Sequence, residues 1–163
     1  MDIPVFVSCP TSLSPDQEQA RKIIRGHLRR FKLEDRALGR SDYPTISPLR
    51  EVLVIAKHCA GGIILGFEQF HSLNGISKPG TPEQARKKDV AFPTPWNNLE
   101  AGILFGLELP LLIFKENAVT GGVFDAGVTD VFVHPMPAGP RDVGIEDVFL
   151  KWQSKVRQKY YGE

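Results

Sequence analysis

Cysteine is scarce in this chain, which has only two cysteines among its 163 residues. Two cysteines do not build the disulfide framework of small secreted domains, so we expect Cys9 and Cys59 to be reduced thiols. Together with the four histidines they show no metal-ligand spacing, and no metal site is expected. Stability must then come from a hydrophobic core, and the length suits one domain over residues 1–163.

Net charge and long apolar runs are also lacking. The formal net charge is +1, which gives no electrostatic reason to expect binding to nucleic acid or to an anionic membrane. No window approaches the roughly 18 uninterrupted apolar residues of a membrane span. The opening Met1–Pro4 lacks the basic and apolar regions of a signal peptide. We therefore expect a cytoplasmic protein that does not bind membranes.

What the chain does contain is a repeated signal for the start of a helix, in which a capping residue precedes a proline. The signal occurs at Ser14-Pro15, Ser47-Pro48 and Thr94-Pro95, and Gln17 completes a capping box with Ser14. Apolar residues at helical spacing follow each start, and a closing helix is indicated over 145–160. The third of these helices is predicted to run from about Trp96 to Leu107.

Short β-favouring runs lie between these helices. They are centred near Val5, Ile64, Ile113 and Phe132. The alternation of strands and helices predicts an open parallel sheet covered on both faces. Residues 33–45 are interpreted as a loop, with a short strand as the alternative. Residues 68–93 show no clear apolar period, and we expect a long functional or mobile loop over the carboxyl edge of the sheet.

Ligands of such sheets bind outside the carboxyl ends of the strands, which selects the loops after Cys9, Phe67, Phe114 and His134. After the first strand, Cys9, Pro10 and Thr11 offer backbone N–H groups and a hydroxyl to a phosphate or ribose, or form a plain turn. Phe67 ends the second selected strand and is a further candidate contact with substrate.

Polar residues outside these loops offer weaker candidates. Arg40 and Asp42 could contact a phosphate and a ribose, although a surface ion pair is the simpler interpretation.

Glu100 is the candidate catalytic residue. It lies in the most apolar helix of the chain, with Leu99, Ala101 and Ile103 as near neighbours. A carboxylate there is either partly buried or directed at a cavity near the start of the helix. Burial would raise its pKa, which is one marker of a working acid. The alternative is a surface glutamate that meets only solvent or an arginine.

Other residues of this helix also invite a functional interpretation. Asn97 and Asn98 could orient a ribose hydroxyl or cap the helix, and Trp96 could stack on a base. Tryptophan side chains are more often buried in the core, and we expect this for Trp96. Gly102 and Gly106 share one face, which predicts close packing of the helix on the sheet.

The spacing from Trp96 to Glu100, W-x-x-x-E before the strand Leu111–Phe114, resembles the TIR domain family. In that family a tryptophan, a small or thiol residue and a glutamate lie at the start of one helix, and that glutamate is the catalytic residue. Glu100-Ala101-Gly102 and Leu109-Pro110-Leu111-Leu112 are also similar to the nucleoside 2-deoxyribosyltransferases. Asn97 departs from the serine or cysteine of many TIR domains. Pro93-Thr94-Pro95-Trp96 stands where the transferases have a D-x-G-T element.

The resemblance implies a three-layer, flavodoxin-like or TIR-like α/β domain that cleaves the N-glycosidic bond of NAD, with Glu100 essential. NAD would be the substrate, as a hydrolase or cyclase would use it, and no cofactor is needed. The resemblance further implies signalling or antiviral defence, and self-association into homo-oligomers. The transferases imply a nucleoside or nucleotide deoxyribosyltransferase or hydrolase instead. A third possibility is a non-catalytic nucleotide-binding or scaffold domain.

Overall fold

The computed structural model describes residues 1–37, 47–139, 142 and 144–162, and within them the chain folds as α/β. Its elements in chain order are β1 (Ile3–Ser8), α1 (Pro15–Arg30), β2 (Leu33–Arg36), α2 (Pro48–Lys57), β3 (Gly62–Gly66), β4 (Phe70–Ser77), β5 (Ala85–Phe92), α3 (Pro95–Gly106), β6 (Leu111–Lys115), the 3-10 helix η1 (Gly122–Phe124), β7 (Val133–Pro135) and α4 (Ile145–Tyr161).

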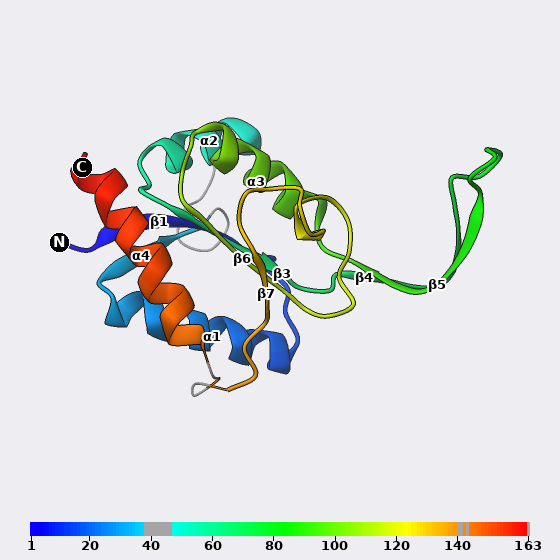
Figure 1. Cartoon of the computed structure of the whole chain (residues 1–163), viewed down its shortest axis with the longest axis horizontal. Coiled ribbons are helices and arrows are strands. Elements are labelled where there is room, and N and C mark those ends of the chain that lie inside the picture. Colours follow the sequence, from blue (N-terminus) through cyan, green and yellow to red (C-terminus); the bar gives the residue numbers. More distant parts are fainter. Residues whose placement is uncertain (38–46, 140–141, 143, 163) are drawn as a thin grey trace.

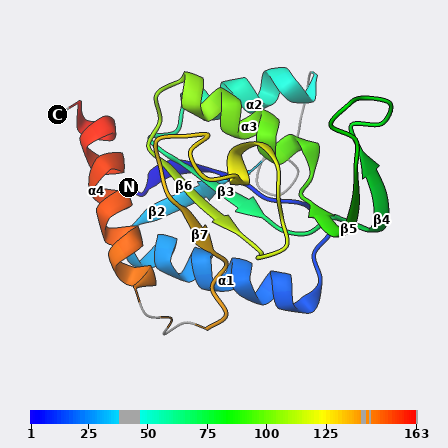
Figure 2. The same cartoon turned by 45° about the vertical axis from the view of Figure 1, so that its right-hand side comes forward.

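The central sheet has the order β2-β1-β3-β6-β7, and every pairing in it is parallel. Helices α1 and α4 cover one face and α2 and α3 cover the other, so the fold has three layers (Figures 1 and 2). This is the flavodoxin-like strand order, and the prediction of an open parallel sheet is confirmed. The loop expected for residues 33–45 is wrong over Leu33–Arg36, which form the edge strand β2, the short strand that was the alternative; residues 38–45 lie outside the described residues.

Local signals set the helix starts. The Ser14 hydroxyl accepts a hydrogen bond from the Gln17 backbone, and the Gln17 side chain accepts one from the Ser14 backbone, which is the predicted capping box. Thr94 caps α3 by accepting from the backbone N–H of Trp96. Pro95 then occupies the first turn of α3, one residue earlier than expected.

The expectation of a long loop over residues 68–93 is wrong. Strands β4 and β5 pair antiparallel from Phe70 opposite Phe92 to Ser77 opposite Ala85. The resulting hairpin projects away from the body of the molecule (Figures 1 and 2). Apart from Ala91 near the base, its strands lie outside the core, so neither shows the alternation of a half-buried strand, and the expected alternation of strand and helix is interrupted.

The expectation for the glycines of α3 is also wrong. Gly102 and Gly106 are exposed, and among the described residues no atom would lie within 4 Å of a Cβ added at either. Close packing depends instead on the strand glycines. A Cβ at Gly62 would lie 2.7 Å from Leu104, and one at Gly66 would overlap the ring of Phe124. The absence of side chains at these strand glycines therefore leaves space for Leu104 of α3 and for Phe124 to pack against the sheet.

Every helix in the described part of the chain is too short or too polar to cross a membrane.

Candidate active site

The sheet has a topological switch point between β1 and β3. These strands are parallel neighbours, and their registers place Ser8 beside Ile64. The chain leaves β1 toward α1 on one face, whereas it leaves β3 through the hairpin toward α3 on the other face. The two connections therefore diverge at the carboxyl ends of adjacent strands. Ligands of doubly wound sheets bind at this position.

Glu100 lies in the second turn of α3 and faces this point. Its side chain is directed inward and is only 8% exposed. Burial raises the pKa of Glu100 from 4.5 to about 7, and a hydrogen bond from the Ser8 hydroxyl opposes the increase. Among the described residues no basic side chain forms an ion pair with Glu100. The predicted inward orientation and raised pKa are both present, and this carboxyl is poised between its two protonation states near pH 7.

Asn97, three residues before Glu100, forms hydrogen bonds with both strands of the switch point. Its amide nitrogen donates to the Ser8 hydroxyl at 2.9 Å and to the Leu65 carbonyl at 3.3 Å. The side chain is fully buried, and within the described residues its Oδ1 has no hydrogen-bond partner. Asn97 therefore holds the ends of β1 and β3 together and fixes Ser8, which in turn contacts Glu100. A buried acceptor without a donor is uncommon in a purely structural cluster.

Trp96 lies in the first turn of α3, one turn before Glu100. It precedes Glu100 by four residues, which places both on the same side of α3. The side chain is 41% exposed, so the expected core position is wrong. Trp96 belongs to neither buried cluster, so this side chain at the start of α3 stays exposed. An exposed aromatic ring next to a buried carboxyl suits the stacking of a base.

Asn98 has a different role from Asn97. Its Oδ1 accepts a hydrogen bond of 2.8 Å from the backbone N–H of Val123, and the side chain lies against Gly122. Asn98 therefore fixes η1 to α3, and this contact occupies its side-chain oxygen.

The remaining sequence candidates fall in several places. Phe67 is fully buried in the core, so its side chain is a packing group. After β1, Cys9 is half-buried and its thiol donates to the Pro10 carbonyl at 3.4 Å. Pro10 is buried and Thr11 is exposed. Arg40 and Asp42 lie outside the described residues.

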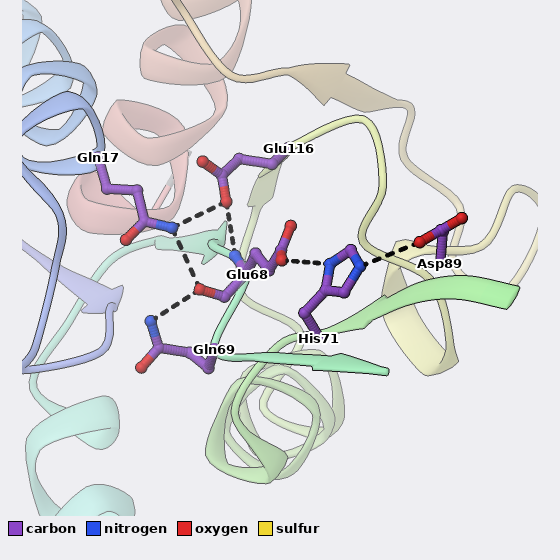
Figure 3. A network of polar contacts seen from close by, with 6 residues as sticks. All are labelled: Gln17, Glu68, Gln69, His71, Asp89 and Glu116. Atoms are coloured by element: carbon purple, nitrogen blue, oxygen red, sulfur yellow. Dashed lines mark hydrogen bonds and ion pairs between the residues drawn. The ribbon is translucent and has the colours of Figure 1, made fainter. Parts of the chain in front are cut away.

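A polar network that the sequence did not reveal fixes the base of the hairpin (Figure 3). The carboxylate of Glu116, just after β6, accepts from the Glu68 backbone N–H at 2.6 Å and from Gln17 at 3.0 Å. Gln17 also donates to the Glu68 carbonyl. His71 lies between Glu68 at 2.7 Å and Asp89 at 3.5 Å.

The network has two consequences. Hydrogen bonds from His71 to Glu68 and then to Asp89 raise the pKa of His71. More importantly, the network ties the chain leaving β3 to α1 and to the end of β6, at the point where the hairpin departs. Of the residues in this network, only Gln17 stands out in the sequence, and there it is explained by the capping box of α1.

A cavity of about 380 Å³ opens at the same edge of the sheet, between α1 and the ends of β6 and β7. Gln19, Lys115 and Glu116 are among its lining residues, and Glu100 is not. Within the described residues, no group of three or more His, Cys, Asp or Glu side chains could hold a metal ion.

Comparison of the chain with protein-family models, with curated proteins and with solved structures gave no significant match in any of the three.

Proposed function

We propose that this protein cleaves the N-glycosidic bond of NAD or a related nucleotide, with Glu100 as the catalytic carboxylate. The observation that carries the proposal is the placement of Glu100. It is buried, has no cationic partner among the described residues, and lies at the switch point of a doubly wound sheet. Natural proteins rarely bury a carboxyl without a compensating cation unless the group has a function.

The chemistry needs one such group. As the base leaves, positive charge develops on the ribose, and a nearby carboxylate stabilises that charge or forms a bond to the carbon. Nicotinamide is already cationic in NAD, so it can leave with the bonding electron pair and without a proton. Water or another nucleophile then takes its place on the ribose.

The raised pKa of Glu100 is compatible with this role. Burial brings the pKa of Glu100 to about 7, so both the protonated and the ionised form are accessible near neutral pH. The positive charge of a bound nicotinamide would lower the pKa again and favour the carboxylate. Substrate binding would then produce the ionised form that catalysis requires.

The neighbouring residues have supporting roles in this proposal. Asn97 fixes Ser8, and the hydrogen bond from Ser8 orients the Glu100 carboxyl. The exposed ring of Trp96 would stack on the base. Consumption of NAD in signalling or antiviral defence is part of the same proposal.

A deoxyribosyltransferase or nucleoside hydrolase is the second candidate, and the pKa of about 7 favours it in one respect. A neutral base needs a proton to leave, and the protonated fraction of Glu100 could supply it.

The test is to incubate the purified protein separately with NAD, ribonucleosides and deoxynucleotides, and to identify released bases by mass spectrometry. Release of nicotinamide supports the first candidate, and release of a purine or pyrimidine supports the second. If no base is released from any of them, a non-catalytic binding domain replaces both.

A further inference from the structure

Among the described residues, the β4–β5 hairpin is anchored only at its base. Ala91 is fully buried, forms a bridge with Val119 and accepts a hydrogen bond from the Thr120 backbone at 3.2 Å. Beyond this point the strands extend into solvent (Figures 1 and 2). An isolated two-stranded hairpin is marginally stable in water. The exposed part of this hairpin therefore lacks the support that a third strand or a helix would provide.

Large apolar side chains are exposed on β4. Phe70 is 64% exposed, Leu73 69% and Ile76 58%. Beyond the bridge from Ala91 to Val119 at the base, the described part of the chain places no strand against the outer edge of β4 or of β5. The remainder of each outer edge is thus a row of backbone groups able to pair with another strand.

The two edges differ in their chemistry. On β5, Arg86, Lys87 and Lys88 are consecutive and exposed, and Asp89 has a φ of 51°, which interrupts the regular strand. Cations and irregular backbone on an edge strand are devices that prevent pairing. Strand β4 carries no Asp, Glu, Lys or Arg. Pairing is therefore discouraged at β5 and left open at β4.

The apolar pattern of β4 is symmetric about Leu73, with Phe70 three residues before it and Ile76 three residues after it. Antiparallel pairing with a second β4 around a two-fold axis at Leu73 places the two Leu73 side chains opposite each other. It also places Phe70 opposite the partner's Ile76. Paired residues lie on the same face of a sheet, so every large apolar side chain of β4 meets an apolar one.

We propose that β4 is a docking edge for β4 of a second copy of this chain. The two hairpins form a four-stranded antiparallel sheet in the order β5-β4-β4-β5. The cationic β5 edges lie outermost and stop further addition, so the assembly is a closed dimer. Self-complementarity about Leu73 is the reason to choose a second copy rather than an unrelated extended peptide. This proposal is independent of the chemistry at Glu100.

The first test measures mass in solution by light scattering for the wild type, Leu73→Lys and Phe132→Lys. Phe132 is 85% exposed and lies outside the hairpin, so it provides a matched control. The wild type and Phe132→Lys are expected to be dimers, and Leu73→Lys a monomer, because its two lysines meet on the axis. Thermal melting should show that Leu73→Lys remains folded. A monomeric wild type at ~100 µM, or a dimeric Leu73→Lys, would overturn the proposal.

The second test fixes the register by oxidative cross-linking of Leu73→Cys and Ser77→Cys. Two cysteines at position 73 lie opposite each other, whereas two at position 77 lie ~27 Å apart, at ~3.4 Å per residue. Cys9 and Cys59 are present in both variants, so the difference reports the new thiol alone. A covalent dimer is expected for Leu73→Cys and not for Ser77→Cys. Equal cross-linking of the two, or none in either, would contradict the pairing.

Discussion

The hydroxyl of Ser8, at the end of β1, donates a hydrogen bond to the carboxyl of Glu100 in the second turn of α3. The bond favours the ionised form of Glu100, whereas burial favours the protonated form. Burial has the larger effect, and the pKa of Glu100 therefore rises to about 7. One contact across the switch point thus moderates a larger effect of desolvation.

Replacing Ser8 by alanine should raise the pKa of Glu100 further, because it removes the hydrogen bond that lowers it. It should also cost about 1–3 kcal/mol of stability, since Asn97 loses a buried partner. The carbon-13 shift of the Glu100 carboxyl, followed against pH, measures the first effect. Ser72→Ala, in the hairpin, is the control and should leave that titration unchanged. A midpoint that stays the same or falls in Ser8→Ala would show that the hydrogen bond does not act on this carboxyl.

Stability should fall with rising pH because of Glu100. Its pKa is about 7 in the folded state and 4.5 as the reference value for the unfolded chain, so the folded state binds more protons between these values. The contribution of protonated Glu100 is complete below pH 4.5 and is lost as pH rises through about 7. The interval corresponds to about 3 kcal/mol.

Glu100→Gln should abolish this dependence, and its melting temperature should exceed that of the wild type by several degrees at pH 8. The two proteins should differ much less at pH 5. Parallel melting curves at pH 5, 6, 7 and 8 provide the measurement. A constant difference between the two proteins across this range would mean that Glu100 has an ordinary pKa.

Two glycines should respond oppositely to alanine. At Gly66 the added methyl would overlap the ring of Phe124, which is buried and cannot withdraw, so Gly66→Ala should cost about 1–3 kcal/mol. At Gly102 the methyl meets no atom of the described residues, and alanine suits a helix better, so stability should rise by about 0.5–1 kcal/mol. Urea unfolding of both variants measures this difference. A loss of stability in Gly102→Ala would mean that the outer face of α3 is covered.

Sequence was sufficient where the determinants are local. The Ser14–Gln17 capping box and the Thr94-Pro95 start depend on neighbouring residues, and both helices begin where these signals lie. Glu100 was also recognisable as a candidate, because it is the only charged residue of α3. The helix pattern left open whether it is buried or on the surface, and the packing of α3 on the sheet decides that it is buried.

Sequence was insufficient where distant segments meet. The bond from Ser8 to Glu100 and the bridge from Asn97 to Leu65 exist because β1 and β3 are neighbours, which no local pattern encodes. The hairpin was missed for a different reason. Phe70, Leu73 and Ile76 recur every third residue on strands that face solvent on both sides, so they show neither the period of a strand nor that of a helix.

The central claim is that the negative charge of Glu100 drives release of the base. Glutamine has nearly the same volume, so Glu100→Gln removes the charge and should preserve the packing around it. The most direct measurement is the rate of base release by the wild type and by Glu100→Gln as a function of pH, with thermal melting as the control for folding. We predict a wild-type kcat/KM that rises with pH through about 7, because kcat/KM reports the pKa of the free protein, and a value at least ~100-fold lower in the variant, equivalent to ~3 kcal/mol of barrier. A variant that releases base as fast as the wild type would contradict it.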